Sequence, residues 1–200
     1  MTEKINFWEE RYRAGQPIWD IGQPAPPFVD YFEGENAPPP GWVIVPGCGQ
    51  GHDALYLAGR GFEVLGVDFA PAAIEVCRAR ASEMNLAAKA SFKQANIFDL
   101  LPQYTQAFDY ALEYTCFCAI PIARRPEYVE LVRGLLKSGG LLVATFFTHG
   151  RPGGPPFDTN QAEIQKLFSP YFEILRLEPP LRSAPSRQGE ETFGLLRRKL

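Results

Sequence analysis

The residues with the clearest chemical signature form a glycine-rich turn made of Gly47, Gly49 and Gly51. The turn follows residues 42–45, a continuous apolar run that is typical of a strand buried on both faces. Glycine is needed where the backbone turns sharply or approaches a ligand closely. Ligands of open α/β sheets bind at the carboxyl ends of the strands, where such turns lie. We therefore expect a ligand site at this turn.

An acidic residue closes the next buried strand, which is predicted over residues 62–67. This residue, Asp68, follows the turn by about 20 residues, and a carboxylate at that spacing can accept hydrogen bonds from both ribose hydroxyls of an adenosine. A tight strand-to-helix turn without any ligand is the simpler alternative. The joint occurrence of the turn and the acid favours an adenosine-bearing cofactor instead.

Glycine spacing and local charge distinguish between such cofactors. A dinucleotide site requires G-x-G-x-x-G, but here the third glycine arrives one residue early and His52 occupies its place. Pyrophosphate would also lie at the N-terminus of the next helix, where Asp53 would repel it. S-adenosylmethionine carries a sulfonium cation and no phosphate. The pattern thus favours S-adenosylmethionine, with S-adenosylhomocysteine as product, and disfavours a nicotinamide-dependent oxidoreductase.

Alternating strands and helices must position these residues. Strands are predicted over 42–45, 62–67, 90–94, 108–114 and 141–147, and helices over 53–60, 71–84, 127–136 and 161–168. Gly139 and Gly140 are expected to end the helix 127–136. Two final strands, 172–177 and 192–197, have no helix between them and predict an antiparallel hairpin. The pattern predicts an α/β fold with a doubly wound, mostly parallel, seven-stranded Rossmann-like sheet.

The N-terminal segment precedes this alternation. Residues 2–13 predict a helix with Thr2 as its N-cap and with Ile5, Trp8 and Tyr12 on one face. A second short helix is predicted over 26–32, and 34–41 is a linker. We expect one domain over residues 1–200, with 1–41 as a helical cover and 42–200 as the core.

Charge and composition limit the class of partner. The net charge is −3, without the basic stripe that nucleic acid requires. No apolar run approaches the length of a membrane span, and the N-terminus does not resemble a secretory signal. The four cysteines lack disulfide-framework spacing, and the Cys116–Cys118 pair has no histidine at metal-ligand spacing. We expect a cytoplasmic protein, monomeric or weakly dimeric, that binds a small-molecule acceptor but no nucleic acid, membrane or metal.

Three strings of the core resemble the thiopurine methyltransferase-like family of class I S-adenosylmethionine-dependent methyltransferases. They are VPGCGQGHDALYLA (45–58), GVDFAPAAIE (66–75) and ANIFDL (95–100). Within that family the chain is most similar to the plant-type thiol and halide methyltransferases, on three further strings: FWEERYRAGQPIWDIGQPAP (7–26), FDYALEYTCFCAI (108–120) and GGPPF (153–157). The resemblance covers nearly the whole chain.

The resemblance implies a set of cofactor-binding residues. Aromatic residues of the N-terminal segment would close over the cofactor, the first glycine and a tyrosine would meet its methionine part, and Asp68 would bind the ribose. The remaining residues of the set would contact the adenosine or its adenine ring. The complete set is Trp8, Tyr12, Trp19, Gly47, Asp68, Phe69, Asn96, Ile97 and Tyr114.

The same resemblance implies Arg125 and Tyr114 as catalytic residues. A thiol, thiopurine, bisulfide or halide is a soft nucleophile, and its in-line methylation requires alignment and exclusion of water rather than a dedicated base. Arg125 could attract an anionic acceptor or lower a thiol pKa. Glu113 stands where the thiol-methylating group commonly has Asp, which could alter the acceptor pocket. A small-molecule O- or N-methyltransferase and a non-catalytic S-adenosylmethionine-binding module remain alternatives.

Overall fold

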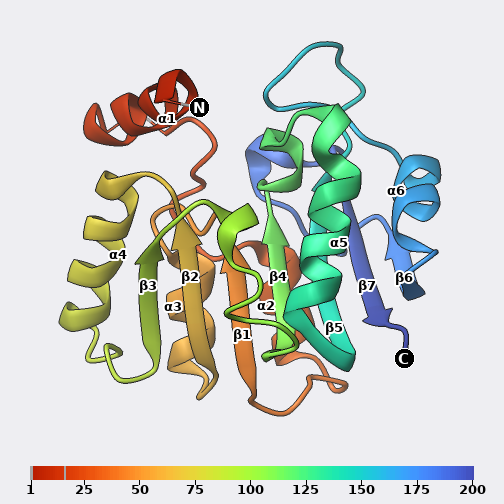
Figure 1. Ribbon diagram of the computed structural model, residues 1–200, viewed down its shortest axis with the longest axis horizontal. Helices are drawn as coiled ribbons and strands as arrows, with labels where there is room; N and C mark the ends of the chain where they lie inside the picture. The colour runs from red at the N-terminus through yellow and green to blue at the C-terminus, as the bar shows by residue number, and fades with distance from the viewer. Residues whose placement is uncertain (1, 16) are drawn as a thin grey trace.

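A single seven-stranded sheet forms the centre of the molecule, in the order β3-β2-β1-β4-β5-β7-β6 (Figure 1). The computed structural model describes residues 2–15 and 17–200, with the side chains of 7–15 and 17–200. Neighbouring strands from β3 to β5 are parallel, and β7 runs antiparallel to both β5 and β6. The strands are β1 (Trp42–Pro46), β2 (Glu63–Asp68), β3 (Ala90–Gln94), β4 (Phe108–Tyr114), β5 (Leu136–Phe147), β6 (Phe172–Glu178) and β7 (Glu191–Arg198). The predicted doubly wound sheet and its antiparallel final strands are confirmed.

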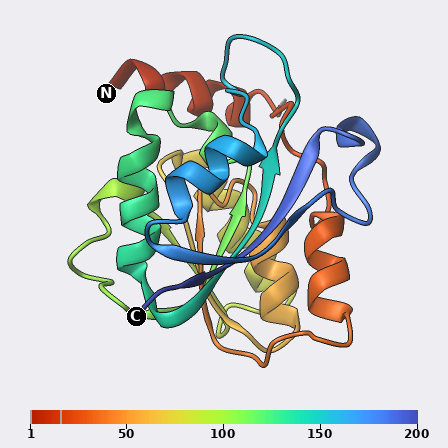
Figure 2. The same cartoon turned by 90° about the vertical axis from the view of Figure 1, so that its right-hand side faces the viewer.

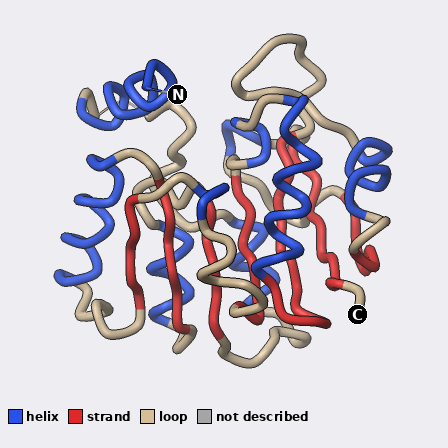
Figure 3. Tube along the Cα trace, viewed as in Figure 1, coloured by secondary structure: helices blue, strands red, loops and turns tan. Residues whose placement is uncertain are grey.

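Helices cover both faces of the sheet (Figure 2, Figure 3). One face carries α2 (Pro26–Glu33), α3 (His52–Gly59) and α4 (Pro71–Glu83), and the other carries α5 (Arg125–Leu135) and α6 (Gln161–Phe168). Short 3-10 helices lie in the connections: η1 (Ile97–Asp99), η2 (Phe117–Ala119), η3 (Ile122–Arg124) and η4 (Pro185–Arg187). Because both faces are covered, the central strands β1 and β2 are almost entirely apolar and buried.

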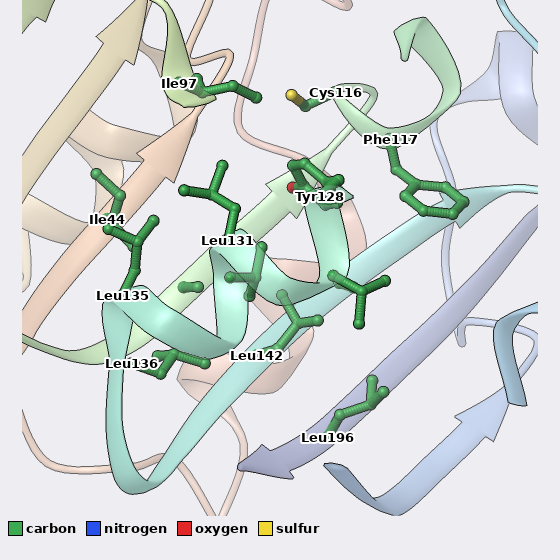
Figure 4. Close-up of a cluster of buried hydrophobic side chains, with 14 of the residues drawn as sticks. Ile44, Ile97, Cys116, Phe117, Tyr128, Leu131, Leu135, Leu136, Leu142 and Leu196 are labelled. Atoms are coloured by element: carbon green, nitrogen blue, oxygen red, sulfur yellow. The ribbon is translucent and has the colours of Figure 1, made fainter. Parts of the chain in front are cut away.

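Each face has its own hydrophobic core. On the α5 side, Leu131 and Leu135 lie in one cluster with Leu142 of β5 and Ile44 of β1, and Ile97 and Cys116 lie at its upper end (Figure 4). On the opposite side, Phe28 and Phe32 of α2 pack with buried residues of α3, α4 and β1. Burial of these side chains holds the helices to the sheet at roughly 25 cal/mol per Å² of apolar surface removed from water.

The helix α1 (Thr2–Arg13) lies beyond the carboxyl ends of β2 and β3, above α4 (Figure 1). Glu9 fixes it there, since its Oε2 accepts a hydrogen bond of 3.1 Å from the N–H of Ala72. Of residues 1–41, which are expected to form a helical cover, α2 packs beside α3 in the helical layer through Phe28 and Phe32. The side chains of Thr2 and Ile5, expected to cap and orient this helix, lie outside the described residues.

The glycine pair after α5 plays a different role from the one predicted. The helix ends at Leu135, and β5 begins at the next residue, so Gly139 and Gly140 lie inside a strand. A Cβ on Gly140 would lie 3.0 Å from the carbonyl oxygen of Asp109, at the point where the register between β4 and β5 shifts. Gly140 therefore permits close strand contact, and Gly139 adopts a left-handed φ of +77° within the strand, so neither ends the helix. No helix in the described part of the chain is long and apolar enough to cross a membrane.

Candidate active site

The turn after β1 has a backbone that only glycine adopts without strain. Gly47, Gly49 and Gly51 have φ angles of +62°, +53° and +80°. A Cβ on Gly47 would lie 2.9 Å from the Sγ of Cys116, and one on Gly51 would lie 2.8 Å from the Sγ of Cys77. The turn is therefore packed against the side chains of Cys116 and Cys77, and it lies at the carboxyl edge of the sheet.

Asp68 ends β2 beside this turn. Its side chain is 6% exposed, and its two oxygens accept hydrogen bonds from the N–H groups of Gly49 (3.1 Å) and Ala70 (2.9 Å). Burial raises the pKa of Asp68 to about 6, although the backbone hydrogen bonds oppose the shift. A carboxylate oxygen has two lone pairs, so each oxygen can accept a further hydrogen bond. The carboxylate is therefore held rigidly at the turn with capacity left for a ligand.

The adenosine-side residues follow the neighbouring strands β2 and β3, whose ends are in register at Asp68 and Gln94. Phe69 comes directly after β2, and its carbonyl accepts a hydrogen bond of 3.4 Å from the Gln94 side chain. Asn96 caps η1 by accepting a hydrogen bond of 3.2 Å from the N–H of Phe98. Ile97 is buried in the core. The fold therefore brings these expected residues to the same edge as the glycine turn.

Aromatic residues of the N-terminal segment form one cluster over the turn. The ring centroids of Trp8 and Trp19 are 4.6 Å apart, and those of Tyr12 and Trp19 are 5.4 Å apart. Trp19 donates a hydrogen bond of 3.1 Å from Nε1 to the Tyr12 hydroxyl. That hydroxyl lies 3.1 Å from the position of a Cβ on Gly49, so any other residue there would crowd it. Burial, helped by the nearby Asp68 carboxylate, raises the pKa of Tyr12.

A polar latch, made of Asp20, His52 and Arg80, joins the cover to the core. His52 Nε2 lies 3.1 Å from Asp20 Oδ1 and 3.1 Å from an Arg80 guanidinium nitrogen. Arg80 also donates a hydrogen bond of 3.0 Å to the Gln50 carbonyl of the glycine turn. Although burial acts in the opposite direction, the hydrogen bonds from His52 and Gly22 lower the pKa of Asp20. Sequence reasoning missed Arg80 and Asp20, because nothing in their local pattern indicates this contact.

Asp53 also fastens the cover. Its Oδ1 accepts a hydrogen bond of 2.7 Å from the N–H of Ala25, and burial raises its pKa to about 6. Its position at the start of α3 keeps a carboxylate, rather than a phosphate-binding amide cluster, at this helix N-terminus.

Tyr114 ends β4 on the other half of this edge. Its hydroxyl donates a hydrogen bond of 3.0 Å to Glu191 Oε1, and its ring packs edge-on against Phe28. The guanidinium carbon of Arg187 lies 5.1 Å from the centre of the same ring. Burial and the adjacent Glu191 carboxylate raise the pKa of Tyr114 while Arg187 lowers it. The hydroxyl therefore remains protonated in the physiological range.

Arg187 is a buried cation at this edge that no carboxylate of the described residues pairs. It is 6% exposed, donates a hydrogen bond of 2.7 Å to the carbonyl of Trp19, and lies 4.7 Å from the centre of the Phe147 ring. None of the ion pairs within 4.0 Å among the described residues includes it. A buried cation without a paired carboxylate is costly unless an anion joins it. Sequence reasoning missed Arg187 because it stands alone in a proline-containing loop.

Glu191 begins β7, four residues after Arg187. It is 4% exposed; its Oε1 accepts the Tyr114 hydrogen bond, whereas its Oε2 is buried without a hydrogen-bond partner of acceptable geometry. Burial raises the pKa of Glu191, against the opposing effects of Ser183, Tyr114 and Arg187. Tyr114 thus contacts a buried carboxylate that sequence reasoning also missed.

Arg125 occupies a different environment from the one expected. It is 1% exposed and donates hydrogen bonds to Glu163 Oε1 (2.8 Å) and to the carbonyls of Phe157 (3.1 Å) and Asp158 (2.9 Å). Its guanidinium lies over the Phe117 ring at 4.6 Å. These contacts neutralise its charge and hold the loop that precedes α6 onto α5. Both terminal guanidinium nitrogens bind protein oxygens, and Nε is buried without a hydrogen-bond partner in the described part of the chain. A direct role of Arg125 toward an acceptor stays a prediction.

Glu113 also faces the interior rather than an acceptor pocket. Its Oε1 accepts a hydrogen bond of 2.8 Å from the N–H of Phe117, and its Oε2 accepts one from the Tyr128 hydroxyl. Burial raises its pKa to about 7. The carboxylate holds the turn after β4, in which Thr115 has a left-handed φ of +61°. The longer side chain therefore supports that turn from inside the protein.

The thiols and the remaining acids do not assemble a metal site. Cys48, Cys77, Cys116 and Cys118 form no disulfide. Burial is the main reason why the pKa values of Cys116 and Cys118 are raised. Among the described residues, no group of three or more His, Cys, Asp or Glu side chains could hold a metal ion.

Comparison with known proteins agrees with this geometry. The chain matches the thiopurine S-methyltransferase family over residues 3–197. It is 32% identical to a probable thiol methyltransferase 2 of Arabidopsis thaliana, over 94% of this chain and 82% of the relative. It is 29% identical to a thiocyanate methyltransferase 1 of the same plant, over 96% of this chain and 85% of the relative.

A solved structure shows the same fold. A 1,6-didemethyltoxoflavin-N1-methyltransferase of Burkholderia thailandensis, crystallised with S-adenosylhomocysteine, superimposes with a TM-score of 0.80 at 18% identity. The match covers 98% of this chain and 88% of that one. The expected class I methyltransferase architecture and the expected dependence on S-adenosylmethionine are confirmed. The chain belongs to the thiopurine S-methyltransferase family.

Proposed function

We propose that this chain transfers the methyl group of S-adenosylmethionine to a small soft nucleophile, such as a thiol, thiopurine, bisulfide or halide, by in-line displacement. The observation that carries the proposal is Arg187, a buried guanidinium without a paired carboxylate, set against the aromatic faces of Tyr114 and Phe147. Such a site suits a polarizable anion or a thiolate, because the cation supplies charge and the rings supply a weakly hydrated surface.

The cofactor side fits an adenosine without phosphate. Asp68 accepts hydrogen bonds from the ribose hydroxyls with its remaining lone pairs, and Gly47 meets the methionine part with its backbone, whose left-handed φ of +62° and close contact with Cys116 leave no room for a side chain. Phe69, Asn96 and Ile97 lie at the adjacent strand ends, where the adenine is expected. When bound, S-adenosylmethionine supplies the electrophilic methyl group.

The cover excludes water and aligns the two ligands. Trp8, Tyr12 and Trp19 form one aromatic layer over the glycine turn, and the carbonyl of Trp19 binds Arg187. The layer that closes on the cofactor is therefore the layer that orients the acceptor-side cation. Alignment of this kind can supply much of the rate enhancement of a displacement reaction.

The direct test is an acceptor panel. Purified protein is incubated with S-adenosylmethionine and iodide, thiocyanate, bisulfide, thiophenol or a thiopurine, and release of S-adenosylhomocysteine is followed. We expect turnover of at least one soft acceptor and none of phenol or aniline, which serve as hydroxyl and amine controls. Turnover of phenol or aniline alone would replace the proposal with O- or N-methylation. Tight cofactor binding without any turnover would favour a non-catalytic binding module.

A further inference from the structure

Two opposite charges of the acceptor side lie close together without pairing. Arg187 and Glu191 stand four residues apart, and both contact Tyr114, one over its ring and the other at its hydroxyl. Their charged groups are not within 4.0 Å of each other, since no ion pair among the described residues contains either of them. Both side chains are more than nine-tenths buried, and Glu191 Oε2 has no well-aligned hydrogen-bond partner among the described residues, although the Ser183 side chain is close enough to lower the pKa of Glu191. A ligand that both donates and accepts would satisfy both residues.

We propose that Glu191 accepts the proton of a thiol acceptor while Arg187 holds the resulting thiolate, which makes Glu191 a further catalytic residue. This inference rests on the proposed function. It also assigns Glu191 a selective role, because an ionised carboxylate beside Arg187 weakens the site for acceptors that are permanent anions.

The thiol gives its proton to Glu191 before its sulfur attacks the methyl group. The S–H bond of the thiol breaks, its proton goes to Glu191 Oε2, and the electron pair stays on the acceptor sulfur. That pair forms the new sulfur–methyl bond as the methyl–sulfonium bond breaks, and the electrons of the broken bond remain on the cofactor sulfur. The proton leaves Glu191 for water when the products depart. Tyr114 keeps Oε1 engaged, so Oε2 is the oxygen available to the thiol.

The two acceptor classes should respond oppositely to pH. Protonated Glu191 leaves the charge of Arg187 uncompensated, so iodide and thiocyanate bind best below the pKa of Glu191. Ionised Glu191 is required for the thiol, so thiol methylation rises with pH through the same pKa and then levels off. Without Glu191, only free thiolate reacts, and the rate continues to rise about tenfold per pH unit up to the thiol pKa.

The effect of Glu191 on the pH profile must be distinguished from the effects of the ionisable groups around it. Burial raises the pKa of Tyr114 on β4, so its hydroxyl stays protonated in this range, and the guanidinium of Arg187 on η4 lies over the same ring. Asp53 on α3 interacts with Glu191 through space and has a pKa of about 6. The preceding residue Glu190 is paired with Arg151 at the surface. Asp53→Asn therefore tests whether a neighbouring carboxylate explains the profile, and Glu190→Gln is the matched control at the next position.

The experiment measures kcat/KM for an alkyl thiol and for iodide between about pH 5 and pH 8.5, a range in which the thiol stays largely protonated. For the wild-type chain and Glu190→Gln, we expect a plateau with the thiol and a decline with iodide as pH rises. For Glu191→Gln, we expect thiol turnover lowered by roughly 100-fold, without a plateau, and iodide turnover retained and independent of pH. Equal losses with both acceptors in Glu191→Gln would overturn the inference, as would a wild-type thiol profile without a plateau.

A second measurement needs no variant of the active site. Calorimetry of thiocyanate binding to the wild-type complex with S-adenosylhomocysteine should show affinity at about pH 5 at least tenfold higher than at about pH 8. Affinity that does not change with pH contradicts the selective role of Glu191. If the wild-type protein methylates neither thiol nor iodide, the proposed function itself fails. If it methylates both but Glu191→Gln changes neither pH profile, only this inference fails.

Discussion

The cofactor side and the acceptor side of the site are built in different ways. On the cofactor side, Asp68 and Gly49 are 19 residues apart, and the contacts between them use backbone N–H groups. On the acceptor side, Trp19 and Arg187 are 168 residues apart, and Tyr114 and Glu191 are 77 apart. One half is a local backbone turn, and the other is a set of side chains gathered from both ends of the chain.

This difference explains why a single fold can serve many acceptors. A glycine turn tolerates little change, because a Cβ at Gly47 or Gly51 would meet a cysteine sulfur at under 3.0 Å. Arg187 and Glu191 lie in or next to a loop, where substitution alters charge without disturbing the central strands. We therefore expect variants of the two halves to separate cofactor binding from acceptor choice.

The largest expected effect is at Asp68. Asp68→Ala removes the carboxylate that binds the N–H groups of Gly49 and Ala70 and is proposed to bind the ribose, so we expect loss of about 3 kcal/mol, or roughly 100-fold, in affinity for S-adenosylhomocysteine. Calorimetry measures the loss. Asp109→Ala is the control, because Asp109 binds Lys137 and the N–H of Trp42 away from the turn. Unchanged affinity in Asp68→Ala would remove the basis for the cofactor assignment.

A smaller effect is expected at Arg125, where a substitution should lower the free energy of unfolding. Arg125→Met breaks the contacts with Glu163 and with the carbonyls of Phe157 and Asp158, and should lower the free energy of unfolding by about 2 kcal/mol. Urea unfolding measures this change, and Arg124→Met, at an exposed ion pair with Glu127, should cost less than about 0.5 kcal/mol. Affinity for S-adenosylhomocysteine should remain, since these contacts lie outside the cofactor half. A stable Arg125→Met protein that lost acceptor affinity alone would restore the direct role expected from its family position.

Arg187→Gln tests whether acceptor choice can change without a change in cofactor binding. Removal of this charge should lower kcat/KM for iodide or thiocyanate about tenfold or more, while affinity for S-adenosylhomocysteine changes less than about twofold. Arg182→Gln, at a surface ion pair with Asp30 near the same loop, is the matched control and should change neither quantity. Parallel losses of cofactor and acceptor binding in Arg187→Gln would show that the two halves are not separable.

The smallest expected effect concerns Glu113 beneath the acceptor half. Its pKa is about 7 in the folded protein against an ordinary value of 4.5, so the folded state holds its proton more tightly than the unfolded state. Its contribution to stability is therefore complete below about pH 4.5 and is lost as pH rises through about 7. Glu113→Gln should reduce this decline between pH 5 and pH 8 by on the order of 1 kcal/mol, as measured by urea unfolding at each pH. An identical pH dependence in the variant would show that Glu113 ionises without cost.

The sequence was most informative where function depends on short spacing. The apolar run before Gly47, the glycine turn and Asp68 were enough to predict the first two strands and their ligand, because strand, turn and acid are adjacent in the chain. The helix end expected at Gly139 was wrong, since a glycine that ends a helix and one that lets two strands approach look alike in the sequence. Arg125 was expected at the acceptor from family position, and its burial against Glu163 could not be read from its type.

The order of the elements, the glycine turn and the acid beside it can be read from the chain, because each depends on residues close in sequence. The pairing of the buried charges depends instead on the folded arrangement, which leaves Arg187 without a carboxylate partner among the described residues and brings Glu191 to Tyr114, the tyrosine that Arg187 contacts. Arg125 forms an ion pair with Glu163, whereas Arg187 contacts aromatic rings and donates a hydrogen bond to a backbone carbonyl. The environment of a charge is set by side chains that are distant in sequence, so its role emerges only when the sheet brings those segments to one edge.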